Sequence, residues 1–66
     1  MQNVRLGETR YYDRAGAFEA RVDVTRGDVT FRYPARVIAP PDADQTWVAS
    51  ALVRNALGQS DTPTLH

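Results

Sequence analysis

The residues of this chain that could do chemistry are few. Its 66 residues include no Cys and one His, His66, and all eight of its basic residues are Arg. A Ser nucleophile needs a neighbouring base and a Schiff base needs Lys, and the chain offers Ser50 and Ser60 neither. Zinc sites are built mainly from Cys and His. The sequence therefore predicts a protein that is not an enzyme and that binds no metal.

Phosphate-binding glycine motifs are missing as well. The four Gly residues form neither a Walker loop nor a dinucleotide fingerprint, which predicts that the protein uses no cofactor. Acid–base chemistry would fall to Glu8, Glu19 and Asp23. The strand pattern described below places these three carboxylates on the solvated face of a sheet, so we interpret them as cross-strand partners of arginines.

The charges of the chain balance. Eight Arg face eight Asp and Glu, and the formal net charge is zero, so no overall field attracts nucleic acid or an anionic membrane. No apolar run approaches the length of a membrane span, and the N-terminal residues carry charges where a signal peptide is apolar. We expect a cytoplasmic protein that does not contact membranes.

Two stretches alternate apolar and polar residues with a period of two, which is typical of half-buried strands. They cover about residues 18–25 and 29–37 and are separated by a turn at Gly27, so they predict a hairpin. Placing Val24 opposite Val29 matches apolar side chains along the whole hairpin and leaves a four-residue loop. That register also sets Arg21 opposite Arg32.

A further strand is predicted upstream, over about residues 4–12, with a turn at Asp13–Gly16. Pairing Tyr12 with Ala17 puts Glu8 opposite Arg21 but turns Val4 and Leu6 outward. A bulge at Gly7 would return these two side chains to the apolar face, because Gly tolerates the backbone angles of a bulge.

The segment after Pro40-Pro41 has the pattern of an amphipathic helix over about residues 43–57. Asp42 and Gln45 fit a capping box at its start, and Gly58 fits the residue that ends a helix. We therefore predict an α+β fold, a three-stranded antiparallel β-meander packed on one C-terminal α-helix (β-β-β-α). It forms a single domain over residues 1–58, followed by a flexible tail over 59–66.

The exposed face of this predicted sheet gathers arginines from three strands. A three-stranded sheet with Arg on its open face and one C-terminal helix behind it resembles in outline the plant ethylene-responsive DNA-binding domains and the small N-terminal domains of some phage-type integrases. The resemblance is one of topology and implies a sheet laid in the major groove. It supports nucleic-acid binding as the alternative function, with four candidate contacts: Arg10, Arg21, Arg32 and Arg36.

Our first choice is a non-enzymatic protein-interaction or assembly module. A core this small is marginal without disulfides, a metal or oligomerisation, so a homodimer is one form that the module could take. Leu6, Ile38 and Trp47 lack an obvious place in the core and are candidates for a partner-binding patch. The edge strand around residues 32–38 is a second candidate surface.

Overall fold

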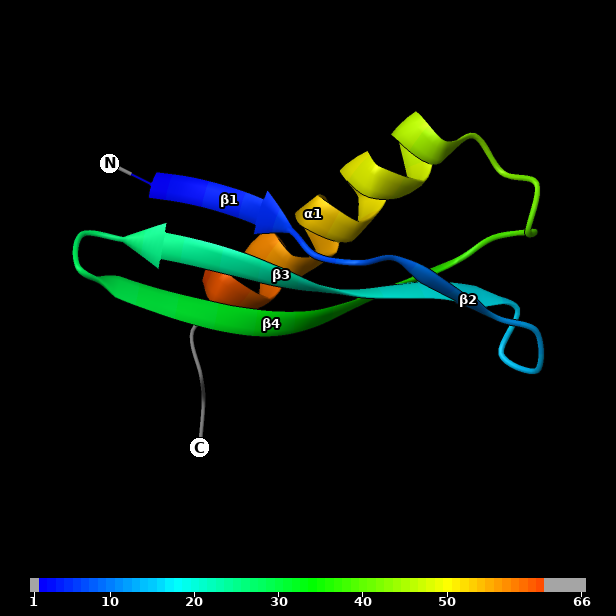
Figure 1. The fold of residues 1–66 in the computed structure, drawn as a ribbon, viewed down its shortest axis with the longest axis horizontal. Helices are drawn as coiled ribbons and strands as arrows, with labels where there is room; N and C mark the ends of the chain where they lie inside the picture. The colour runs from blue at the N-terminus through cyan, green and yellow to red at the C-terminus, as the bar shows by residue number, and fades with distance from the viewer. Residues whose placement is uncertain (1, 62–66) are drawn as a thin grey trace.

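The computed structural model describes residues 2–61 and consists of one antiparallel sheet and one helix (Figure 1). The α+β class is confirmed. The number of strands differs from the prediction, because the sheet has four strands where three were expected. The elements are β1 (Gln2–Leu6), β2 (Arg10–Tyr12), β3 (Ala17–Arg26), β4 (Val29–Ile38) and α1 (Gln45–Asp61).

The extra strand arises because the predicted first strand is broken at Gly7. Both of its parts, β1 and β2, pair with β3, and they lie end to end along the same side of it (Figure 1). Leu6 pairs with Val22 and Arg10 with Glu19. Between these two pairs, the segment that joins β1 to β2 therefore has one more residue than the facing segment of β3. This is the predicted bulge. Gly7, and not Glu8, faces Arg21.

Close approach explains why glycine occupies the bulge. The Gly7 N–H donates a hydrogen bond to the Arg21 carbonyl oxygen at 2.8 Å. A Cβ added at Gly7 would lie 2.9 Å from that same oxygen, which is closer than a carbon atom tolerates. The bulge brings Val4 and Leu6 onto the apolar face of the sheet, as the sequence predicted.

The β3–β4 hairpin has a tighter loop than the one predicted. Val24 pairs with Phe31 and Arg26 with Val29, so the loop is Gly27-Asp28 and the register is shifted by two residues. Gly27 has a φ of 59°, the positive value that the first loop residue of a type II′ turn requires. The expected pair of Arg21 with Arg32 is therefore wrong, and Arg21 faces Pro34.

The helix begins and ends later than the sequence indicated. Asp44, and not Asp42, caps the helix, since Asp44 Oδ2 accepts a hydrogen bond from the backbone N–H of Trp47 at 2.9 Å. At the other end α1 continues through Gly58 to Asp61. Gly58 does not adopt the positive φ of a residue that ends a helix. The predicted tail boundary at residue 58 thus falls inside the helix, and the rest of that tail, 62–66, lies outside the described residues.

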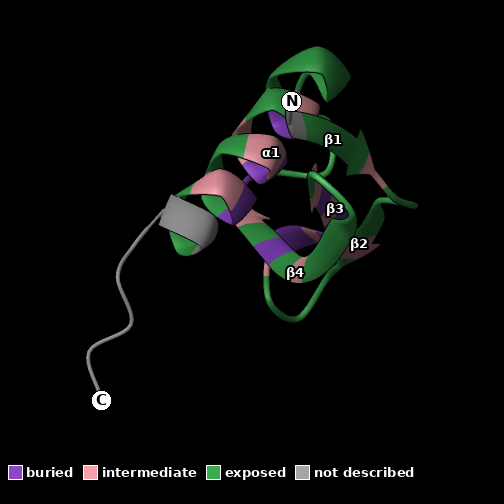
Figure 2. Ribbon diagram, turned by 90° about the vertical axis from the view of Figure 1, so that its left-hand side faces the viewer, coloured by how far each residue is buried: buried purple, intermediate pink, exposed green. Residues whose placement is uncertain are grey.

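The core lies between α1 and one face of the sheet, which we call the inner face (Figure 2). Its fully buried large side chains are Val22 and Val24 from β3 and Leu52 from the middle of α1. The other buried core residues among those described are four alanines, Val48 on α1 and Phe18, and the half-buried rings of Tyr11 and Tyr33 pack against this core. Few large side chains are buried, so the core is small even for a chain of this length.

The helix covers only part of the inner face. A strand of ten residues spans about 33 Å, whereas the buried positions of α1 from Val48 to Ala56 span only about 12 Å. Val29 and Phe31 share the inner face with Val22 and Val24, as expected from the alternation, but they remain 50% and 46% exposed.

Candidate functional site

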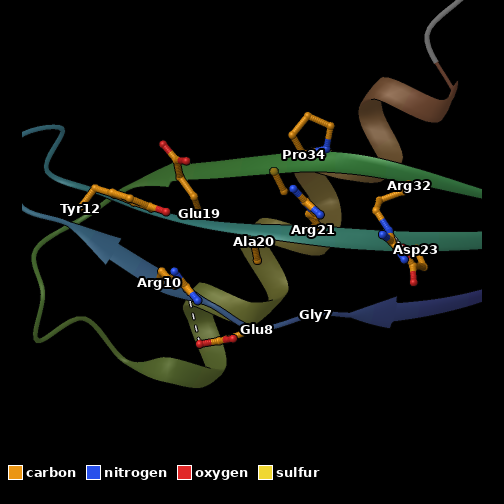
Figure 3. Close-up of a pocket in the computed structure, with 11 residues that line it drawn as sticks. Gly7, Glu8, Arg10, Tyr12, Glu19, Ala20, Arg21, Asp23, Arg32 and Pro34 are labelled. Atoms are coloured by element: carbon orange, nitrogen blue, oxygen red, sulfur yellow. Dashed lines mark hydrogen bonds and ion pairs between the residues drawn. The ribbon is translucent and has the colours of Figure 1, made fainter.

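The outer face of the sheet, opposite the helix, carries all four arginines that the sequence singled out. Figure 3 shows three of them, Arg10, Arg21 and Arg32. Three of the four form ion pairs. Arg32 Nε lies 2.9 Å from Asp23 Oδ1, Arg36 Nη2 lies 2.8 Å from Glu19 Oε2, and Arg10 Nε lies 3.5 Å from Glu8 Oε2. Asp23 and Glu19 are cross-strand partners of arginines, as expected, whereas Glu8 pairs with Arg10 two residues along the chain and not with the expected Arg21.

The register of the hairpin creates these pairs. Asp23 faces Arg32 and Glu19 faces Arg36 directly across β3 and β4. The hydrogen bond from Arg32 to the Asp23 carboxylate, with the attraction between their charges, raises the pKa of Arg32 above its ordinary value.

Arg21 is the exception among the four. Its row across the sheet consists of Gly7 on one side and Pro34 on the other, and neither offers a carboxylate. Among residues 2–61 no ion pair or side-chain hydrogen bond is made by Arg21. Figure 3 shows its side chain between Gly7 and Pro34.

The short side chains of this row leave a depression of about 670 Å³ on the outer face. Three arginines and three acidic residues line it, so its formal charge is zero. The side chains that surround Arg21 in this depression are Glu8, Arg10, Tyr12, Glu19, Asp23 and Arg32.

The three apolar residues predicted to form one patch do not come together. Leu6 pairs with Val22 on the inner face and packs against the core. Ile38 pairs with Ala17 on the outer face and is 73% exposed. Trp47 lies in the first turn of α1 and is 47% exposed. Leu6 and Ile38 therefore lie on opposite faces of the sheet.

A different apolar surface was missed by the sequence analysis. Val4, Val29 and Phe31 are 38%, 50% and 46% exposed on the inner face, and Val4 and Phe31 flank the buried Val24 on its two sides. We call these three residues the hairpin patch. A signal was present in the sequence, because two alternating strands of this length make a sheet face longer than one helix can cover.

The edge of the sheet at β4 is largely closed. Gln59 Nε2 on α1 donates a hydrogen bond to the Pro34 carbonyl oxygen at 2.6 Å, and Asn55 Oδ1 accepts one from the Arg36 N–H at 3.3 Å. Pro34 itself has no N–H to offer. An incoming strand therefore could not pair continuously along residues 32–38, the edge that the sequence suggested.

The residues that the structure describes contain no group of three or more His, Cys, Asp or Glu that could hold a metal ion, and His66 lies outside them. No helix within residues 2–61 is long and apolar enough to cross a membrane.

Comparison of the chain with protein-family models, with curated proteins and with solved structures gave no match. The function must therefore be inferred from the surfaces of the chain itself.

Proposed function

We propose that this chain is a non-enzymatic protein-interaction module. The observation that carries the proposal is the hairpin patch, in which Val29 and Phe31 on β4 and Val4 across β3 are exposed on one face beside a small core. Isolated exposed apolar side chains are common, but grouped ones are typical of protein-binding surfaces. Covering Val29 and Phe31 would add apolar burial to a domain whose own core is small.

Self-association is the form of this function that can be tested with the purified chain, without a second protein. We expect the mass measured by sedimentation and light scattering to rise with protein concentration towards that of a dimer. Because apolar contacts are not screened by salt whereas charge contacts are, the association should be the same at low and high salt. A chain that stays monomeric up to millimolar concentration would contradict self-association.

Nucleic-acid binding through the outer face is the alternative, and the unpaired Arg21 is the observation in its favour. Its weakness is charge, because three acids accompany three arginines in the depression and phosphate binding depends on net positive charge. A titration with duplex DNA at two salt concentrations tests it. Binding that weakens steeply with salt and is lost in Arg21→Gln would favour this alternative over the first.

A further inference from the structure

The two edges of the sheet differ in how their outward-facing backbone groups are satisfied. At β4, Pro34 removes a donor and two side chains of α1 bond the backbone. At β1, the backbone groups of Val4 and Leu6 turn away from β3, because Gly7 is bonded to β3 and the bonded positions of a ladder alternate. Within the described chain these outward groups have no hydrogen-bond partner.

Unpaired backbone groups on an edge strand are a template for another strand. In Figure 1, β1 lies at the margin of the sheet with no strand beyond it. Within β1 no Pro interrupts the strand, its single charged residue, Arg5, is already opposite Asp23, and the bulge at Gly7 lies beyond its end. The edge at β4 is protected, and the edge at β1 is open.

We propose that β1 pairs antiparallel with β1 of a second copy of the chain, around a twofold axis at Val4. This inference rests on the proposed function and specifies where the self-association occurs. Val4 of one copy then faces Val4 of the other, and these two residues exchange a pair of backbone hydrogen bonds. The two sheets become one continuous sheet with both helices on the same face.

The sequence of β1 favours a second copy as the partner because it is complementary to itself in this register. An axis at Val4 sets Asn3 opposite Arg5, a neutral amide opposite a cation. An axis one residue further along would set Arg5 against Arg5, and like charges directly opposite each other destabilise a sheet. The register at Val4 also uses the outward-facing backbone groups of both strands.

The pairing also covers apolar surface. Val4 is the member of the hairpin patch that lies on the open edge, and it is 38% exposed. In each copy, Val4, Val24 and Phe31 form one cross-strand row. In the dimer, contact between the two Val4 side chains would join the rows of the two copies. An apolar strip would then run across both copies without interruption.

A proline scan of the two edges tests the inference. Val4→Pro removes the outward N–H at the open edge, where a proline is tolerated by the fold. It should weaken the dimer roughly thirtyfold, because each dimer loses two backbone hydrogen bonds. Thr30→Pro is the matched control at an outward-facing position of β4 and should leave the dimer unchanged. Circular dichroism checks that both variants are folded.

Cross-linking gives a second measurement that does not depend on weakening the dimer. The chain has no Cys, so a disulfide-linked dimer can form only through the introduced Cys of each copy. Paired residues of an antiparallel ladder lie within the Cα separation that a disulfide spans. Under mild oxidation, Val4→Cys should form a disulfide-linked dimer at concentrations at which Thr30→Cys stays monomeric on a non-reducing gel.

The outcomes separate this inference from the function on which it rests. Selective loss of the dimer in Val4→Pro, together with cross-linking through Val4→Cys, supports pairing at β1. A dimer that survives Val4→Pro, fails to cross-link through Val4→Cys and is lost in Phe31→Thr overturns the inference but keeps the interaction module. A wild-type chain that never dimerises overturns the inference and self-association as a form of the function, whereas binding of a different protein through the hairpin patch would still satisfy the proposed function.

Discussion

Asp23 and Arg32 face each other across β3 and β4, and the Arg32 Nε donates a hydrogen bond to Asp23 Oδ1 at 2.9 Å. The neighbouring outer-face pairs are complementary too. The hydroxyl oxygens of Thr25 and Thr30 lie 2.9 Å apart. Two opposite pairs along the hairpin thus join opposite charges, whereas Arg21 faces Pro34. These pairs reduce the positive charge that the outer face offers to an anionic polymer.

A double-mutant cycle can measure this relationship. Because the Asp23–Arg32 pair is exposed, we expect a small favourable coupling between Asp23→Ala and Arg32→Ala that shrinks as salt is raised. The free energy of unfolding in urea, at low and high salt, is the measurement. A cycle between Arg21→Ala and Arg32→Ala is the control and should show no favourable coupling. Coupling of equal size in the two cycles would contradict the observed register.

The same pairs show how the hairpin register could have been predicted. Apolar matching alone cannot distinguish registers that differ by two residues, because both keep the same side chains on the same face. The outer face does distinguish them, since only the observed register sets Asp23 and Glu19 opposite arginines. The two-residue loop also places Pro34 at a non-bonded position, so its missing N–H removes no hydrogen bond from the β3–β4 ladder.

Features that depend on contacts between distant segments could not be predicted. The helix continues past Gly58 while Gln59, in its last turns, bonds the Pro34 carbonyl oxygen on β4. Neither this bond nor the closed edge that results from it is encoded in the periodicity of the helix. By contrast, the strand alternation, the bulge at Gly7 and the turn at Gly16 follow from local sequence alone.

Two glycines should respond in opposite ways to substitution by alanine. Gly7→Ala should lower the free energy of unfolding by roughly 1–3 kcal/mol, because the new Cβ would lie 2.9 Å from the Arg21 carbonyl oxygen. Gly58→Ala should raise it by about 1 kcal/mol, since no atom lies within 4 Å of its added Cβ. Urea unfolding of both variants is the test, and destabilisation by Gly58→Ala would argue against a helix at that position.

The start of the helix can be tested at two aspartates. Asp44→Ala removes the oxygen that accepts the Trp47 N–H and should cost about 1 kcal/mol of stability. Asp42→Ala should cost less, because Asp42 precedes the cap and makes no such bond among the described residues. Thermal unfolding of the two variants distinguishes the observed cap from the one that the capping-box pattern suggested. Equal losses in both would contradict a cap at Asp44.

Opening the edge at β4 should make the chain aggregate. Three features close that edge, namely the missing N–H of Pro34, the amide of Gln59 on its carbonyl and the Asn55 oxygen on the Arg36 N–H. The triple variant Pro34→Thr, Asn55→Ala, Gln59→Ala restores a continuous row of unpaired backbone groups, and such a row recruits further strands. We expect it to form large assemblies that bind thioflavin T, with growth that rises with concentration.

Ser50→Ala with Arg54→Ala, on the exposed side of α1, is the control and should remain as soluble as the wild type. A triple variant that stays soluble would mean that Arg32 and Arg36 are sufficient to protect the edge through their charge.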